Sequence, residues 1–434
     1  MNLYSMLQAR GAEGKPVRAG LIGAGKFGSM FLSQVPSTPG LEVSVIADLS
    51  PERARTACRV VGWDEDRIAA TKFVEDGRAL AVSDKVDVVI DATGSPAAGI
   101  AHALAAIENG KHVVMVNVEA DVLAGPALAK RARAAGVVYS MAYGDQPALV
   151  AEMVDWARAT GFRVQAAGKG TKYLPDYHQV TPDDVWTHYG LSPDAAHAAG
   201  MNPQMFNSFL DGTKSAIEMA AIANACDLDV PTDGLAFPPC GVDDLSRVLR
   251  PREIGGLMEG AGMVEVISSL ERDGRPVFRD LRWGVYVVLE APNDYAAACF
   301  RQYGLPVDST GRYASMYKPF HLIGLELGFS VLSAALRFEP TGQSRVFRGD
   351  AVAVAKRDLV VGDMLDGEGG FTVWGKLLPA RTSLEKKALP IGLAHGIKVT
   401  RPVKAGEVVT LQDVEQLLDG QVMRLRREAE ALVG

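Results

Sequence analysis

The chain has 434 residues, a formal net charge of −7 and four widely spaced cysteines, Cys58, Cys226, Cys240 and Cys299. This length is too great for one ordinary hydrophobic core and predicts two or three domains, and the negative charge argues against binding to nucleic acid. Because the cysteines lack metal-ligand spacing, and neither a signal-peptide pattern nor a long apolar run occurs, we expect a soluble cytoplasmic protein without a membrane segment.

A glycine-rich turn follows the first predicted strand. An apolar run at 19–22 predicts a buried parallel strand, and apolar residues at helical spacing over 30–35 predict a helix after it. Gly23 permits a tight turn, Gly25 lets a pyrophosphate approach the backbone, and Gly28 lets the helix pack on the strand. The turn therefore predicts a dinucleotide site, the alternative being a turn that only packs a helix. Its candidate residues are Gly23, Gly25, Lys26, Phe27 and Gly28.

An acid and a base follow the second predicted strand, 43–47. Asp48 lies twenty positions after Gly28, where a carboxylate accepts a hydrogen bond from a ribose hydroxyl. Ser50 and Pro51 predict the start of a helix, and Arg53 in its first turn is the nearest candidate to bind a 2′-phosphate. Asp48 favours NAD and Arg53 favours NADP, so the two signals conflict.

Two further strands are predicted at 86–92 and 113–116, each followed by small or polar residues. Carboxyl ends of neighbouring parallel strands border the ligand in doubly wound sheets, so we expect these residues around the nicotinamide. They are Thr93, Gly94, Asn117 and Glu119. The alternating pattern predicts an α/β fold with a doubly wound parallel sheet of Rossmann type over 1–147, with a returning helix near 320–338.

From about residue 148 the pattern changes to an α+β substrate domain, 148–345. Strands are predicted at 162–168, 263–268 and 281–289, and a loop carrying Lys169 and Lys172 is expected after the first of them. Asp211 precedes Lys214 at a helix start, where the acid would orient the lysine. A loop and one helix over 313–338 carry His321. Beyond 345, short strands predict a small β domain, 346–434, ending in a polar helix at 414–432.

Several stretches together resemble the homoserine dehydrogenase-like superfamily, and more closely its deoxyxylulose-phosphate reductoisomerase-like oxidoreductases. They are GLIGAGKFGSMF, VVMVNVEAD, YGDQPAL, GKGTKY, FLDGTKSAIEMA and YKPFHLIGLE. The tail from Ala351 resembles a SAF-type β-clip domain. The resemblance implies NAD(P)H-dependent reduction of a small hydroxylated or phosphorylated carbonyl substrate by a homodimer. It also implies that 148–345 is the dimerisation domain as well as the substrate domain. It favours NADP as cofactor, with NAD kept open.

The chain departs from this superfamily at one position. In homoserine dehydrogenases the strand corresponding to 113–116 is followed by Asn-Lys, whereas here Asn117 is followed by Val118 and Glu119. Reduction of a carbonyl needs a proton donor for the alkoxide, which a lysine of lowered pKa can supply. The catalytic candidates are Lys214, Asp211, Lys169, Lys172, His321 and Glu119, and a GKGTK loop would equally suit phosphate binding.

Three alternatives stay open at this point. A metal site is possible, because the reductoisomerases that the chain resembles bind a divalent ion, but Asp and Glu residues form no dense cluster at ligand spacing, so no metal ligands are named. The substrate could be another small polyol or hydroxy acid, because such a scaffold can exchange its substrate loops. The SAF-like tail and the absent superfamily lysine also suit a sensor that binds NAD(P) without turnover.

Overall fold

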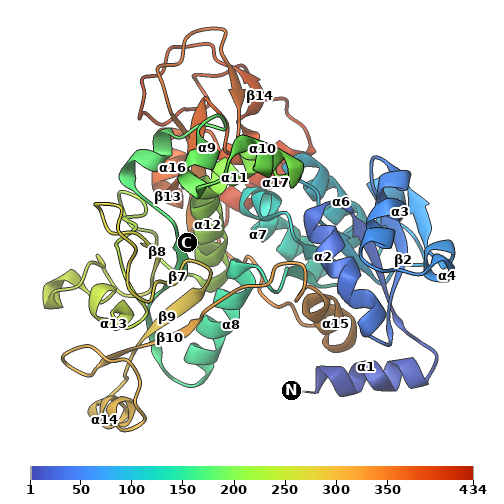
Figure 1. Ribbon diagram of the computed structural model, residues 1–434, viewed down its shortest axis with the longest axis horizontal. Coiled ribbons are helices and arrows are strands. Elements are labelled where there is room, and N and C mark those ends of the chain that lie inside the picture. The colour runs from blue at the N-terminus through green and yellow to red at the C-terminus, as the bar shows by residue number, and fades with distance from the viewer. Residues whose placement is uncertain (1, 434) are drawn as a thin grey trace. The chain divides into compact units, whose positions relative to one another are not determined.

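The computed structural model describes residues 2–433, which divide into two compact units (Figure 1). The first unit contains residues 2–152, 321–345 and 419–432, and the second contains 153–320, 346–418 and 433. The domain boundaries expected from the sequence stay a prediction. No helix within 2–433 is long and apolar enough to cross a membrane.

The first unit is built on a six-stranded parallel sheet in the order β3-β2-β1-β4-β5-β6. Its strands are β1 (Val17–Ile22), β2 (Leu41–Ala47), β3 (Lys72–Val74), β4 (Val88–Asp91), β5 (His112–Met115) and β6 (Tyr139–Met141). The strand order reverses between β1 and β4, which is where doubly wound sheets bind their ligands. The predicted α/β class with a Rossmann-type sheet is confirmed.

Helices connect these strands and cover the sheet. They are α1 (Leu3–Ala12), α2 (Lys26–Gln34), η1 (Val35–Ser37), α3 (Pro51–Val60), α4 (Glu65–Ala70), α5 (Gly77–Ala81), α6 (Pro96–Glu108), α7 (Val118–Ala134), α15 (Gly328–Arg337) and α17 (Gln421–Glu430). Helix α8 (Gln146–Ala159) carries the chain into the second unit. Local caps explain several starts: Ser50 caps α3 ahead of Pro51, and Ser95 caps α6 ahead of Pro96.

The last helix differs from its prediction as a polar tail over 414–432. Helix α17 is shorter, and it packs on α7 through Leu425, Arg426 and Ala429, all of which are buried. Arg426 is buried because its guanidinium Nε donates to Glu430 at 2.8 Å, one helical turn away. The polar composition of this segment therefore did not indicate that one side of the helix is buried.

The second unit contains a four-stranded mixed sheet in the order β10-β9-β7-β8. Its strands are β7 (Arg163–Thr171), β8 (Met263–Ser268), β9 (Val285–Glu290) and β10 (Tyr313–Lys318). The other elements before residue 320 are η2 (Pro175–Gln179), α9 (Val185–Tyr189), α10 (Pro193–Ala198), α11 (Pro203–Leu210), α12 (Thr213–Cys226), α13 (Leu245–Val248), η3 (Arg252–Ile254) and α14 (Asp294–Gln302).

Three predictions about this sheet were wrong. Strand β7 continues to Thr171, where a loop was expected, because Gly168 and Gly170 let neighbouring backbones come close: an added Cβ would lie 1.8 Å and 1.9 Å from the carbonyl oxygens of Glu265 and Leu281. Residues 313–318 form β10 and pair with β9, where a loop was expected. Strand β9 begins at Val285, four residues later than expected.

The last part of the second unit forms two antiparallel strand pairs. Strand β11 (Gly349–Ala355) pairs with β13 (Val373–Pro379), and β12 (Met364–Asp366) pairs with β14 (His395–Lys398). They are accompanied by α16 (Ala380–Lys386) and η4 (Ile391–Leu393). Helix α12 contacts β7 and β8 as well as β11 and β13. Lys214 is the one residue of α12 that is not buried, so this helix is an internal element of the unit.

Candidate cofactor and substrate sites

The glycine turn packs its backbone closely against neighbouring segments at two positions and is open at a third. Gly23 has φ +94°, and an added Cβ would lie 2.7 Å from the carbonyl oxygen of Ala92. At Gly28 a Cβ would lie 2.3 Å from the carbonyl oxygen of Gly23, so the helix and the turn touch directly. Gly25 is the N-cap of α2, and a Cβ there would meet no described atom within 4 Å. Helix α2 begins with Lys26 and Phe27, and Gly25 gives its first N–H groups no side-chain cap, so these groups are the ones that would bind a phosphate.

Asp48 is buried and paired with Arg53. Its Oδ2 accepts from the backbone N–H of Ala24 at 3.0 Å, and its Oδ1 accepts from the N–H of Ser50 at 3.0 Å. The Arg53 guanidinium donates to the same Oδ1 at 2.7 Å, while 65% of the arginine side chain stays exposed. Asp48, which favours NAD, and Arg53, which favours NADP, thus form an ion pair with each other.

A polar network lies at the carboxyl ends of β4 and β5. Asn117 caps α7: its Oδ1 accepts from Ala120 N at 3.0 Å, and its Nδ2 donates to Ser95 O at 2.9 Å. Thr93 donates through Oγ1 to Asp91 Oδ1 at 2.7 Å and accepts from Asn117 Nδ2 at 3.4 Å. The structure therefore brings Thr93 and Asn117 together, as expected from the strand order. At Gly94 an added Cβ would meet no described atom within 4 Å.

Sequence reasoning missed Asp91 and His102 in this network. Asp91 is fully buried at the end of β4, and its Oδ2 lies 2.7 Å from Nδ1 of His102. The acid at the next-to-last position of the predicted strand 86–92 was the available signal, but the histidine lies eleven residues further on, in α6. Glu119 lies half-buried in the first turn of α7, where the helix dipole favours a carboxylate.

Asp121 is a buried carboxyl on α7 that the sequence did not indicate. Its Oδ1 accepts from the hydroxyl of Tyr139 at 2.9 Å, and its Oδ2 accepts from the hydroxyl of Ser344 at 2.7 Å. Burial raises the pKa of Asp121 to about 6, and the two hydrogen bonds only partly offset that effect. This carboxyl joins β6 and the 321–345 segment to α7 within the first unit.

In the second unit, Lys169 and Glu218 form a buried ion pair. Lys169 lies in β7 and Glu218 in α12, and Nζ of the lysine donates to Oε2 of the glutamate. Their side chains are 6% and 4% exposed. Because Lys169 belongs to the sheet, the expected phosphate-binding loop at this residue is not present. Both groups are instead fixed on regular secondary structure.

Asp211 does not orient Lys214, so that expectation was wrong. Its Oδ2 lies 2.8 Å from Nζ of Lys356, which also donates to the carbonyl oxygens of Val180 and Gly370 at 2.7 Å and 2.8 Å. Asp211 ends α11 and its carboxyl is fully buried, so the carboxyl group meets a lysine from the C-terminal strands. Lys214 lies 3.9 Å from Glu368, with 18% of its side chain exposed.

A histidine that the sequence analysis did not select, His178, adjoins Asp211. Its Nδ1 bonds to the carbonyl oxygen of Asp211 at 2.7 Å, so this nitrogen carries the proton, and Nε2 accepts from the hydroxyl of Tyr173 at 3.0 Å. The ring stacks on Trp374 with centroids 3.8 Å apart. Burial lowers the pKa of His178, so the imidazole is neutral at pH 7. Only the folded chain brings Trp374 to this histidine.

The remaining candidates are less enclosed. Lys172 is half-buried and donates to the carbonyl oxygen of His188, and burial together with the charge of Arg282 lowers the pKa of Lys172. His321 lies half-buried in the segment before α15. Within residues 2–433, no group of three or more His, Cys, Asp or Glu side chains is arranged to hold a metal ion.

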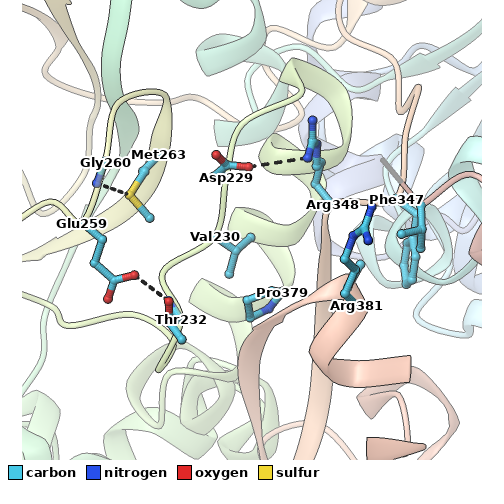
Figure 2. A pocket seen from close by; sticks show the side chains of 12 residues that line it. Asp229, Val230, Thr232, Glu259, Gly260, Met263, Phe347, Arg348, Pro379 and Arg381 are labelled. Atoms are coloured by element: carbon cyan, nitrogen blue, oxygen red, sulfur yellow. Dashed lines mark hydrogen bonds and ion pairs between the residues drawn. The ribbon is translucent and has the colours of Figure 1, made fainter. Parts of the chain in front are cut away.

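A cavity of about 340 Å³ lies elsewhere in the second unit (Figure 2). Its charged lining residues are already paired: Arg348 lies 3.6 Å from Asp229, and Thr232 donates to Glu259 at 2.7 Å. None of the predicted catalytic residues lines it. We therefore place the candidate chemistry at the groups described above.

Two protein-family models match consecutive parts of the chain. Residues 23–141 match the NAD-binding domain of homoserine dehydrogenase, and residues 144–327 match the catalytic domain of the oxidoreductase DRL. Homoserine dehydrogenase from Neisseria gonorrhoeae is 33% identical over 112 residues, which cover 24% of this chain and 23% of that protein. The chain thus spans about a quarter of the length of this curated relative.

Solved structures with similar folds include several dehydrogenases and reductases. A 3-ketoreductase from Actinomadura kijaniata, crystallised with NADP, is 21% identical and covers 37% of this chain and 48% of its own, with a TM-score of 0.27. A probable dehydrogenase from Thermotoga maritima is 15% identical, covers 75% and 90%, and has a TM-score of 0.39. A myo-inositol dehydrogenase from Corynebacterium glutamicum is 13% identical, covers 64% and 73%, and has a TM-score of 0.35.

The two family matches agree with the geometry of the glycine turn. The chain therefore contains a domain similar to the NAD-binding domain of homoserine dehydrogenase, followed by a domain similar to the catalytic domain of the oxidoreductase DRL.

Proposed function

We propose that the protein is an NAD(P)H-dependent reductase of a small hydroxylated or phosphorylated carbonyl compound, with deoxyxylulose 5-phosphate as the first substrate to test. The observation that carries the proposal is the open backbone at Gly25, where α2 begins without a side-chain cap, in a chain whose next segment matches an oxidoreductase catalytic domain. In this proposal the dinucleotide binds at the glycine turn of the first unit.

Hydride delivery to a carbonyl produces an alkoxide, which needs a cationic proton donor. Lys214 is our first candidate because it lies at the start of a buried helix, keeps part of its side chain exposed, and is therefore both fixed and accessible. Lys169 is the alternative, held by Glu218 on a rigid strand but almost fully buried. Glu119, Lys172 and His321 stay as further candidates.

We propose NADP as the preferred cofactor, with NAD kept open. Asp48 is held by two backbone N–H groups, which persist when Arg53 turns away from it. The exposed guanidinium of Arg53 can then bind a 2′-phosphate through charge-assisted hydrogen bonds. Comparing the dissociation constants of NADPH and NADH tests this preference, and tenfold tighter binding of NADH would overturn it.

Activity is tested by following NADPH consumption with deoxyxylulose 5-phosphate and a panel of ketoses, aldehydes and hydroxy-acid precursors. Turnover of the first compound with rearrangement of its carbon skeleton supports a reductoisomerase. Turnover of another compound alone points to a dehydrogenase of a polyol or hydroxy acid. Binding of NADPH without reduction of any compound favours the sensor.

We further propose a homodimer formed through the second unit, whose C-terminal strands would be of SAF type. Large apolar side chains stay exposed on this unit at Phe278, Trp283, Tyr295 and Tyr303. Light scattering coupled to size-exclusion chromatography measures the mass, and a monomer at micromolar concentration would contradict the dimer.

A further inference from the structure

Two cations of the second unit meet at one aromatic ring. Nζ of Lys172 and Cζ of Arg282 each lie 5.8 Å from the centroid of the Tyr189 ring. Both side chains are half-buried. A cation over an aromatic face gains a modest attraction, but two like charges at one ring repel each other. The charge of Arg282 is accordingly one cause of the lowered pKa of Lys172.

The backbone fixes this juxtaposition. Lys172 directly follows β7 and Arg282 lies just before β9, and these two strands are antiparallel neighbours. Lys169 pairs with Val285, and the N–H of Gly170 donates to the carbonyl oxygen of Gly284 at 3.1 Å. Counting outward from this register brings residues 172 and 282 opposite each other. The two charges therefore meet because of the strand pairing, which a change of rotamer does not remove.

Neither cation forms an ion pair with a carboxylate in the described part of the chain. Arg282 contacts the rings of Tyr189 and Trp283, and Lys172 donates to a backbone carbonyl. Three more deeply buried cations of this unit have acidic partners. These are Lys169 with Glu218, Lys356 with Asp211 and Arg250 with Asp308. Two adjoining half-buried cations without an acid are unfavourable unless an anion from outside the chain joins them.

We propose that Lys172, Arg282 and the Tyr189 ring form the subsite that binds the phosphate group of a phosphorylated substrate. The arginine offers a planar fork of N–H donors and the lysine a compact ammonium, a combination that suits a tetrahedral oxyanion. The ring holds both cations in place while its hydroxyl donates to the carbonyl oxygen of Phe206 at 3.3 Å. This inference rests on the proposed reduction of a small carbonyl compound and narrows that compound to a phosphate ester.

Inorganic phosphate is the probe, titrated into the full chain by calorimetry in a chloride buffer without any dinucleotide. We expect one saturable site whose Kd rises tenfold or more in Lys172→Gln and in Arg282→Gln, while Lys172→Arg keeps most of the affinity. Arg247→Gln is the matched control, because Arg247 is an exposed arginine of the same unit paired only with Asp244. Circular dichroism shows whether each variant is folded.

A competition experiment then tests whether inorganic phosphate occupies the site that binds the phosphate group of the substrate. Phosphate should inhibit turnover of a phosphate ester competitively in wild type and tenfold more weakly in the two variants. The subsite is disproved if wild type binds no phosphate, or if the double variant binds it with unchanged Kd. If the protein reduces unphosphorylated compounds and binds no phosphate, the subsite proposal is wrong and the proposed reductase function stands. If it binds phosphate and consumes no NADPH with any compound, the reductase function is wrong and the anion site stands.

Discussion

The carboxyl of Asp211 lies 2.8 Å from Nζ of Lys356, and both side chains are almost completely buried. The sequence predicted a different partner for Asp211, because Lys214 follows it by three residues and was expected to pair with it. A fully buried pair leaves an uncompensated charge when one member is removed, and this loss is large even where the intact pair contributes little.

Lys356→Met should therefore lower the free energy of unfolding by about 3–5 kcal/mol. Chemical denaturation followed by circular dichroism measures the change. Lys404→Met is the matched control, because Lys404 and Asp358 form an exposed pair at 2.8 Å, whose loss should change the free energy of unfolding little. Equal effects of the two variants would contradict the central role of the buried pair.

Lys214→Ala should lower turnover by roughly a hundredfold or more, the order expected for loss of a general acid, and leave the Kd of NAD(P)H nearly unchanged. Steady-state rates on an accepted substrate and a separate measurement of cofactor binding check this. Lys386→Ala, at an exposed lysine of α16, serves as control. Wild-type turnover in Lys214→Ala would transfer the role to Lys169 or His321.

Arg53→Gln should weaken NADPH binding about tenfold and change NADH binding little, since only NADPH carries the 2′-phosphate that the guanidinium would bind. Fluorescence titration of the reduced cofactors gives both Kd values. Arg59→Gln on the same helix is the control, because Arg59 forms an exposed pair with Glu65. Equal losses for NADPH and NADH would show that Arg53 acts only through Asp48.

Asp121→Asn should change the pH dependence of stability. The pKa of Asp121 is about 6 in the folded chain and about 3.9 in the unfolded chain, so the folded state holds an extra proton between these values. Lowering the pH from 7 through 6 towards 4 therefore stabilises the wild type relative to the variant. Urea unfolding at pH 7 and pH 5 measures this gain, with Asp66→Asn at an exposed site as control. A pH-independent difference between wild type and Asp121→Asn would contradict the raised pKa.

The features of the first unit that the sequence predicted are local ones. The turn at Gly23, the helix start at Ser50 and the acid at Asp48 are each set by residues within one strand-turn-helix unit, so spacing alone identifies them. The proximity of Asn117 and Thr93 could also be predicted, because neighbouring parallel strands end at the same edge of the sheet.

The second unit was predicted less well because its polar contacts join distant segments. His178 meets Trp374, and Arg282 meets Lys172, only after the sheet has formed. The glycines around Lys169 resembled a loop, since their role in a strand depends on the neighbouring carbonyl of Leu281. A pattern of residues along the chain carries no information about such partners.

The position of α12 between two sets of strands limits how this protein could have been assembled by gene fusion. The helix contacts β7 and β8 on one hand and β11 and β13 on the other, and all of its residues except Lys214 are buried. A chain ending before β11 would expose apolar residues of this helix to water and leave Asp211 without its lysine. The C-terminal strands are therefore not an interchangeable attachment, and a recombinant version of the catalytic segment needs both parts in one polypeptide.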